Sequence, residues 1–275
     1  MIFINPGNPD GRVWTREELN ELTKVVKENP HIIVLSDEVY CRHIFDKKEF
    51  IPFASLEGMY DRTITMYSFG KVFYCTGWRV GGASGPEKLI KPLKNFILEN
   101  TDGVSVLSKL AIGYALKLAE EPYEGFKTYY EWNINDFEQR RDRVVEIMRK
   151  SKIGDFEIIE SHGTYTFAVG IKNIIKLVPI KYYYMVSGVP AEEKRERIQS
   201  FEEFKTLKNP DATCDLAVNN YFIFEYGVGF MPGTSFYYNT DTDIKEHNGA
   251  TILRVSFCKN DSEIDKFEKI FLGKK

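Results

Sequence analysis

The sequence lacks the features that mark several classes of protein. Its four cysteines (Cys41, Cys75, Cys214 and Cys258) are far apart and include no CxxC pair. This spacing argues against a disulfide framework and a zinc site and favours a reducing compartment. The four histidines are equally dispersed, so we predict no metal. No apolar run approaches the roughly 18 residues of a membrane span, and the N-terminus has no signal peptide. A net charge of −3 gives no reason to expect nucleic acid or a membrane as partner.

What is present is the composition of a globular protein of 275 residues, 43% hydrophobic and 28% charged. In the first half, short apolar runs alternate with helical stretches, which predicts an α/β domain with a mostly parallel sheet. The predicted strands are residues 1–5, 31–36, 62–67 and 79–83. One helix is predicted to begin at Thr15, where Glu18 completes a capping-box spacing. Two further helices are predicted over residues 86–100 and 104–120.

A long charged helix over residues 126–150 is expected to lead into a second domain. We place the boundary after residue 150, with a large domain at 1–150 and a smaller α+β domain at 151–275. The smaller domain is predicted to contain strands near 156–160, 164–171 and 251–257 and helices at 216–226 and from Ser262. Residues 172–211 have weak periodicity and more charge, and we interpret them as a surface insertion.

Two segments at the ends of predicted strands carry polar side chains. Residues 5–11 read NPGNPDG, most often only a turn, although two prolines would hold the loop rigid and let Asn8 project into a site. Residues 36–40 read SDEVY. An aspartate after a buried strand is often a helix N-cap, but Asp37 and Tyr40 are three residues apart and would share a face of one helical turn. A carboxylate and a phenol that converge there suit a cofactor with a basic nitrogen and a neighbouring oxyanion.

A third segment, residues 68–79, reads SFGKVFYCTGWR. A lone lysine is usually solvated, but Lys71 follows a buried strand and is flanked by apolar residues. A partly desolvated lysine near another cation has a lowered pKa and becomes a nucleophile. Arg79 would supply that charge and bind phosphate, and the Ser68 hydroxyl would donate to a phosphate oxygen. In open α/β sheets, ligands bind at the carboxyl ends of the strands, where all these residues are expected.

The last segment, residues 251–257, reads TILRVSF. If the head of Arg254 is buried in this alternating strand, it needs an anionic partner. A surface arginine on an edge strand is an equally open alternative.

Together these segments resemble the signature of fold-type I pyridoxal-phosphate (PLP) aminotransferases of class I/II. The patterns NPxNPxG, SDEVY and SxGKxFxxTGW(R/K)xG occur here in that order. With residues 56–65, LEGMYDRTIT, they are most similar to the group of kynurenine aminotransferases, glutamine transaminase K and cysteine-conjugate β-lyases. The resemblance covers nearly the whole chain and is weakest over residues 172–211.

The resemblance implies a role for each of these residues. Lys71 would hold the cofactor covalently and move the proton of the substrate Cα. Asp37 would pair with the pyridine nitrogen of PLP and keep its ring a strong electron sink. Asn8 and Tyr40 would bind the ring oxygen, and Asn8 would also face the substrate. Ser68 and Arg79 would bind the phosphate, and Arg254 would bind the substrate carboxylate through a bidentate pair.

The chain departs from the family pattern because relatives carry a long segment before the NPxNPxG loop. That segment holds a phosphate-binding turn, a ring stacked on PLP and much of the dimer interface. We therefore expect the C-terminal part of the large domain, with four contiguous strands and unpaired sheet edges that invite another chain. Losing a helix-terminus phosphate site should weaken PLP binding, so we expect poor or no turnover.

The predicted activity is transfer of an amino group between a kynurenine-, glutamine- or aromatic-type amino acid and a 2-oxo acid, in a homodimer. One alternative is a cysteine-S-conjugate β-lyase, which uses the same residues; another is a non-catalytic fragment that acts only by pairing with another subunit. The expected location is the cytoplasm, or the mitochondrion if an N-terminal segment is missing.

Overall fold

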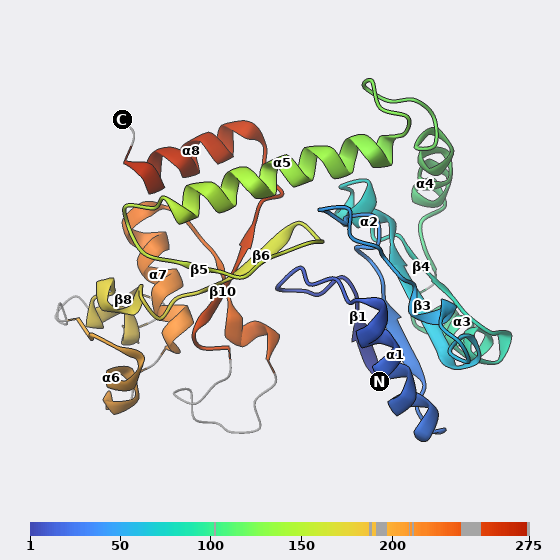
Figure 1. Ribbon diagram of the computed structural model, residues 1–275, viewed down its shortest axis with the longest axis horizontal. Helices are drawn as coiled ribbons and strands as arrows, with labels where there is room; N and C mark the ends of the chain where they lie inside the picture. Colours follow the sequence, from blue (N-terminus) through green and yellow to red (C-terminus); the bar gives the residue numbers. More distant parts are fainter. Residues whose placement is uncertain are drawn as a thin grey trace. The chain divides into compact units, whose positions relative to one another are not determined.

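The computed structural model describes residues 1–101, 103–186, 189–190, 197–208, 210, 212–237 and 249–273. The chain divides into two compact units (Figure 1). The first comprises Met1–Glu138 with His162–Thr164, and the second comprises Gln139–Ser161 with Tyr165–Lys275. The division falls inside helix α5 (Tyr129–Arg149). The expected domain boundary after residue 150 stays a prediction.

The first unit is built on a four-stranded sheet whose order follows the chain, β1-β2-β3-β4. The first three strands are parallel and the fourth is antiparallel, so the prediction of a mostly parallel sheet with contiguous strands is confirmed. The strands are β1 (Ile2–Ile4), β2 (Val34–Asp37), β3 (Thr63–Ser68) and β4 (Gly81–Ser84).

Helix α1 (Arg16–Glu28) covers one face of this sheet. It begins at the predicted capping box: the Thr15 hydroxyl accepts a hydrogen bond from the Glu18 backbone N–H, and the Glu18 carboxylate accepts one from the Thr15 N–H. The two side chains therefore satisfy backbone donors that the first helical turn cannot. The helix is amphipathic, and its apolar side packs on the sheet in a core of Phe3, Leu19, Val26, Val34, Ile51, Phe53, Leu56 and Met59.

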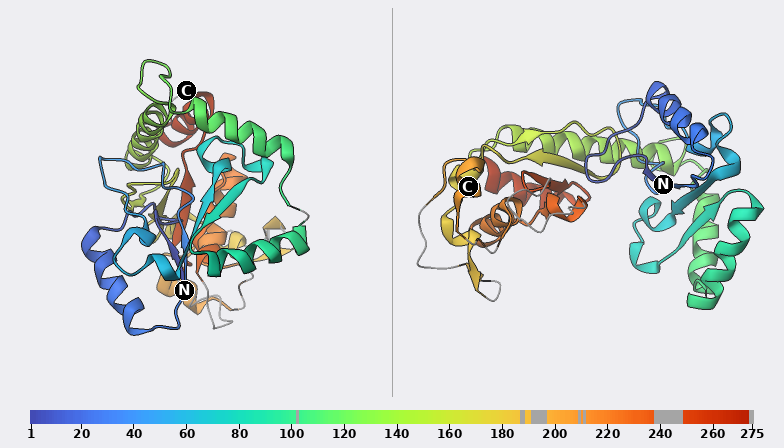
Figure 2. Two further views of the ribbon diagram at one scale, coloured as in Figure 1. Left: turned by 90° about the vertical axis from the view of Figure 1, so that its right-hand side faces the viewer. Right: turned by 90° about the horizontal axis from the view of Figure 1, so that it is seen from below.

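The remaining elements of this unit are short turns and two longer helices. The turns are η1 (Phe53–Ser55), η2 (Tyr60–Arg62), α2 (Phe69–Val72) and η3 (Thr76–Trp78), and the helices are α3 (Glu87–Thr101) and α4 (Val106–Leu118). Both longer helices were predicted to within a few residues. Figure 2 shows them following β4 along the chain.

The second unit is an α+β structure around an antiparallel sheet of order β5-β6-β10-β9. Its strands are β5 (Glu157–Ile158), β6 (Thr166–Gly170), β9 (Met231–Pro232) and β10 (Ile252–Ser256), with a separate β7–β8 hairpin at Met185–Val186 and Val189–Pro190. Helices α7 (Cys214–Tyr226) and α8 (Asp261–Leu272) complete it. Phe156, Phe222 and Phe271 pack as a triangle, with ring centroids 5.8–6.0 Å apart.

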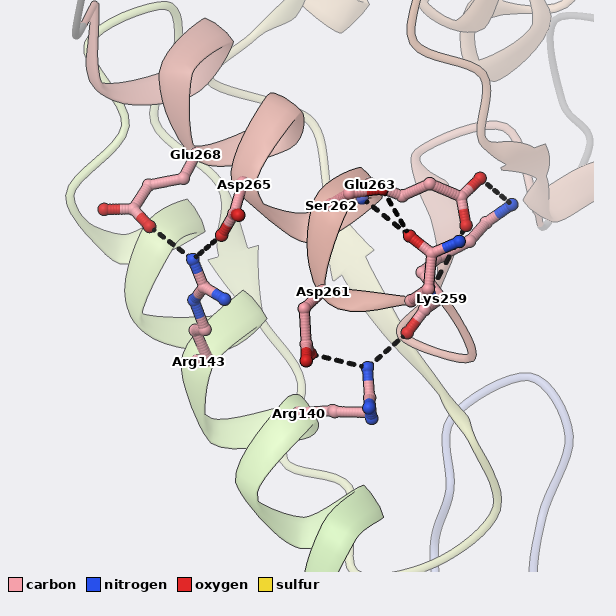
Figure 3. Close-up of polar contacts among 9 residues, drawn as sticks. Arg140, Arg143, Lys259, Asp261, Ser262, Glu263, Asp265 and Glu268 are labelled. Atoms are coloured by element: carbon pink, nitrogen blue, oxygen red, sulfur yellow. Dashed lines mark hydrogen bonds and ion pairs between the residues drawn. The ribbon is translucent and has the colours of Figure 1, made fainter.

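Ion pairs join α8 to the charged helix α5 within this unit (Figure 3). Arg143 Nη2 lies 2.6 Å from Asp265 Oδ1 and 2.8 Å from Glu268 Oε2. One turn earlier, Arg140 Nη1 lies 3.0 Å from Asp261 Oδ1 and donates to the Lys259 carbonyl. The charged residues for which this helix was predicted to be a connector between domains therefore also bind α8 to α5.

The interpretation of residues 172–211 as a surface insertion is wrong for much of its described part. Ile175, Tyr182, Tyr183 and Phe204 are at most 1% exposed, and the rings of Tyr183 and Phe204 are 5.4 Å apart. These side chains come from η4 (Ile175–Leu177), η5 (Ile180–Tyr183) and α6 (Phe201–Thr206). Elements this short bury apolar residues without a helix or strand period, so periodicity could not reveal them. Residues 187–188, 191–196, 209 and 211 lie outside the described chain.

Candidate active site

The carboxyl ends of three parallel strands meet at one edge of the first unit's sheet. Asp37, the last residue of β2, is in register with Ile4 of β1 and Met66 of β3. The ladder continues past the strands, because the Asn5 N–H donates to the Asp37 carbonyl and the Glu38 N–H to the Met66 carbonyl, both at 3.1 Å. Side chains that follow these strands therefore start from adjacent positions.

The loop after β1 carries Asn8 and is held by its own hydrogen bonds. The Gly7 N–H donates to the Arg12 carbonyl at 2.7 Å, and the Gly11 N–H donates to the Gly7 carbonyl at 2.9 Å. Gly11 has φ 73°, in the region that favours glycine. The loop base is fixed by Asn5, 1% exposed, whose side-chain oxygen accepts from the Trp14 N–H. Asn8 itself is partly exposed on this closed loop.

The segment after β2 is not the helical turn that the spacing of Asp37 and Tyr40 suggested. Asp37 Oδ1 accepts a bond from the Val39 N–H at 3.3 Å, and two successive tight turns follow, closed by Cys41 N–H to Glu38 and His43 N–H to Tyr40. The Asp37 carboxylate thus closes a local turn and caps no helix. Tyr40, 7% exposed, is held inside the turns.

Lys71 lies in the single turn α2, directly after β3, and approaches Tyr40. Its Nζ is 5.6 Å from the centroid of the Tyr40 ring. The tight path of the chain depends on Gly70, because a Cβ there would lie 2.9 Å from Cα of Thr76, closer than real Cβ contacts. Ser68, the last residue of β3, precedes this turn. The lysine, the phenol and the serine hydroxyl are therefore brought to the same edge.

Arg79 reaches this edge by the antiparallel pairing of β4. Gly81 is in register with Ser68, so residue 79 stands just beyond the carboxyl end of β3. Arg79 has φ 53°, and its guanidinium donates to the Thr76 carbonyl at 3.3 Å. The side chain is exposed and bound only weakly to the chain's own backbone, so it is accessible to an anion.

Arg254 belongs to the second unit. It lies on β10, which pairs with β6 on one side and β9 on the other, so the alternative of an arginine on an edge strand is wrong. Its guanidinium carbon is 4.8 Å from the centroid of Phe236, within the range of a cation–π contact. Its predicted role toward a substrate carboxylate stays a prediction.

Sequence reasoning missed two buried residues beside the site, His43 and Glu38. His43 is fully buried, with ring centroids of Tyr40, Tyr74 and Phe137 at 5.7–6.3 Å. Burial, and then the charge of Lys71, lowers the pKa of His43 to about 4. A lone histidine in a turn carries no sequence signal for such a position.

Glu38 is 1% exposed, and its Oε1 accepts from the Ser36 hydroxyl at 2.9 Å and the Phe53 N–H at 3.0 Å. Burial raises its pKa. The residue anchors the end of β2 to η1. The sequence does show an acidic pair at residues 37–38, but only Asp37 was predicted to have a role.

Comparison with known proteins places this arrangement in a family. Residues 1–269 match the model of aminotransferase class I and II. The chain belongs to this family.

Relatives in this aminotransferase family agree with the resemblance seen in the sequence. A kynurenine–oxoglutarate transaminase of Dictyostelium discoideum is 30% identical over 97% of this chain and 54% of its own length. An aspartate aminotransferase of Pinus pinaster is 36% identical over 86% of this chain and 41% of its own length. The expected similarity to the kynurenine aminotransferase group is confirmed. The chain spans about half the length of these relatives.

Solved structures show the same fold. An N-succinyldiaminopimelate aminotransferase from Mycobacterium tuberculosis is 25% identical, with a TM-score of 0.69 over 98% of this chain and 56% of its own. An Escherichia coli protein described as having methionine aminotransferase function is 20% identical, with a TM-score of 0.72 over 99% of this chain and 58% of its own. The α/β fold of this aminotransferase chain is therefore established.

The residues at the sheet edge fit pyridoxal phosphate, the cofactor of this family. The groups that PLP requires are an amine for its aldehyde carbon, a carboxylate for its ring nitrogen, donors for its ring oxygen and donors for its phosphate. The first three correspond to Lys71, Asp37 and the Tyr40 phenol with the Asn8 amide. Each group starts from a strand end or the turn after it, and the amine lies beside the phenol. Among the described residues no cluster suited to a metal ion occurs, and no helix is long and apolar enough to cross a membrane.

Proposed function

We propose that this chain is the lysine-bearing part of a PLP-dependent aminotransferase that moves an amino group between an amino acid and a 2-oxo acid. The observation that supports this most is the approach of Lys71 Nζ to the Tyr40 ring at the sheet edge where Asp37 ends β2. An amine, a carboxylate and a phenol at adjacent strand ends match the functional groups of one cofactor.

PLP, when bound, supplies the electron sink that stabilises negative charge on the substrate Cα. In this proposal Asp37 holds the ring nitrogen protonated, because a carboxylate beside it favours the charged form. Tyr40 and Asn8 bind the ring oxygen. Lys71, in the turn after β3, would hold the cofactor and would move a proton at the substrate Cα.

Two arginines complete the proposal. Arg79, with the Ser68 hydroxyl, binds the phosphate, and its exposed guanidinium on the edge beyond β3 supports this role. Arg254 binds the substrate carboxylate as a bidentate pair. A kynurenine-, glutamine- or aromatic-type amino acid, a homodimeric assembly and the cytoplasm remain parts of the proposal; the four free cysteines support a reducing compartment.

The test is the visible absorption of the purified chain with added PLP, beside two variants. Lys71→Ala removes the proposed attachment point, and Lys94→Ala removes an exposed lysine of α3 as the matched control. We expect a yellow band in the wild type and Lys94→Ala that is absent in Lys71→Ala. After borohydride reduction, mass spectrometry should locate the cofactor on Lys71. A folded wild-type chain with no band, or an unchanged band in Lys71→Ala, would overturn the assignment.

A further inference from the structure

Two side chains on one face of helix α7 hold the short strand β9 of the second unit. Asp215 and Asn219 are four residues apart, so they share that face of the helix. The side-chain oxygen of Asn219 accepts a hydrogen bond from the Phe230 N–H at 2.7 Å, just before β9. Asp215 Oδ2 accepts two hydrogen bonds from Thr234, just after β9: one from its N–H at 2.8 Å and one from its hydroxyl at 2.9 Å. Helix α7 therefore fixes the chain at both ends of β9.

The contact between Asp215 and Thr234 is built to persist. Asp215 is fully buried and lies in the first turn of α7, where the helix dipole favours a carboxylate. Hydrogen bonds to an ionised carboxylate are stronger than those between neutral groups. A buried carboxylate also destabilises the fold when its hydrogen bonds are broken. We therefore expect both bonds from Thr234 to be kept in the folded chain.

The turn that Asp215 holds is η6 (Gly233–Phe236), which follows β9 directly. Its first residue is packed against backbone: a Cβ at Gly233 would lie 2.6 Å from the Ile252 carbonyl oxygen and closer still to that of Gly249. Only glycine allows such an approach. The turn is therefore fixed both by the Asp215 carboxylate and by the backbone that leads into β10.

The last residue of this turn, Phe236, meets Arg254 of β10. The guanidinium carbon lies over the Phe236 ring, 4.8 Å from its centroid. A guanidinium is planar and its N–H donors lie in that plane, so a ring packed on it orients the plane and leaves an edge for a bidentate carboxylate. An arginine already held in its binding geometry loses less conformational entropy when an anion binds. The position of η6 therefore decides how well Arg254 is oriented.

We propose that Asp215 is a positioning residue for the carboxylate site at Arg254. Through Thr234 it fixes η6, and through Phe236 the turn orients the guanidinium, so Asp215 raises the affinity for a carboxylate that it does not touch. This inference rests on the proposed role of Arg254 toward the substrate carboxylate and deepens it. All four residues belong to the second unit, so the effect does not depend on PLP.

The experiment is NMR of the full chain with ¹⁵N-labelled arginine, in which the Nε–Hε signal of Arg254 is identified by its loss in Arg254→Lys. The signal is read without ligand, where the Phe236 ring displaces it upfield, and is then titrated with 2-oxoglutarate. We expect Asp215→Asn to reduce the upfield displacement and to weaken 2-oxoglutarate binding about threefold to tenfold, as Phe236→Leu should. Asp155→Asn, the same change at an exposed position of the same unit, should alter neither.

The position of the Arg254 signal separates positioning from a purely structural role, which would lower stability without moving the signal in the folded chain. If Asp215→Asn does not fold, Thr234→Val removes only the hydroxyl donor and should move the signal in the same direction, while Thr234→Ser should leave it in place.

Three results would be decisive against these assignments. Unchanged 2-oxoglutarate binding in the folded Asp215 variant, or in Thr234→Val if that variant replaces it, would overturn the inference and leave the role of Arg254 intact. An Arg254 signal that does not respond to 2-oxoglutarate in the wild type would overturn that role and the inference with it. A normal Arg254 titration in a chain that forms no Lys71-dependent band would overturn the proposed cofactor attachment alone.

Discussion

Acidification from pH 7 to pH 5 should destabilise the first unit through His43. This side chain is fully buried among Tyr40, Tyr74 and Phe137, and Lys71 lies close enough to affect its charge. Both burial and the lysine oppose a charged imidazolium. The folded state therefore holds His43 neutral, while the unfolded chain lets it take up a proton.

The magnitude follows from the two pKa values. The pKa of His43 is 6.5 in its ordinary state and about 4 in the folded chain. Because the folded-state value is depressed, the unfolded state binds more protons below pH 6.5, and stability falls as the pH falls. The loss is negligible at pH 7, reaches roughly 2 kcal/mol at pH 5 and levels off below pH 4.

Urea unfolding of the wild type and His43→Leu at pH 7 and pH 5 measures this effect. Leucine fills a similar volume and cannot titrate, so the variant should lose roughly 2 kcal/mol less between the two pH values. Glu38, whose raised pKa acts in the opposite direction, is present in both chains and cancels. Equal losses in the two chains would refute the reasoning, because they would mean that His43 is protonated as readily in the folded state.

Three further predictions concern the fold and are measured by chemical denaturation. Thr15→Ala removes the α1 cap and should cost about 1 kcal/mol, whereas Thr15→Ser should cost little. Gly70→Ala pushes a Cβ to 2.9 Å from the Thr76 backbone and should cost about 1–3 kcal/mol; Gly113→Ala, with no described atom within 4 Å of its Cβ, should be neutral or stabilising. Arg143→Gln breaks the partly exposed pairs with two carboxylates of α8 and should cost about 0.5–1 kcal/mol, less in 1 M salt; a salt-independent cost would contradict an ionic role.

The parts of the fold that were predictable are those in which one local signal dominates. The apolar run of residues 32–35 indicates β2, because Val34 is buried in the core beside α1 and β2 pairs with a strand on each edge. Thr15 and Glu18 mark the start of α1 because the capping box satisfies donors that no other nearby group can reach. In each case the physical cause lies within a few residues of the signal, so the sequence alone contains it.

The parts that escaped prediction depend on contacts between distant residues. The two-residue strand β9 exists only because β10 pairs with it, and Met231–Pro232 alone has no strand pattern. The burial of Tyr183 depends on Phe204, which comes from a separate short helix. His43 is buried by Phe137, which is more than ninety positions away in the chain. Phe137 belongs to a helix whose sequence is rich in charged residues and does not indicate a buried ring. No local period records such pairings.

The candidate site is held by contacts within this chain, whereas other parts of the same unit are left exposed. Asp37 and Ser68 are fixed by hydrogen bonds between strands that this chain contains, and the turn of Lys71 is fixed by the close approach of Gly70 to Thr76. The exposed apolar side of α4 (Leu107, Leu110, Tyr114 and Leu118) and the outer edges of β1 and β4, by contrast, are left uncovered within the described chain. Cofactor attachment at Lys71 needs only the first group of contacts. We therefore expect the Lys71-dependent absorption band to form in this chain without any added polypeptide.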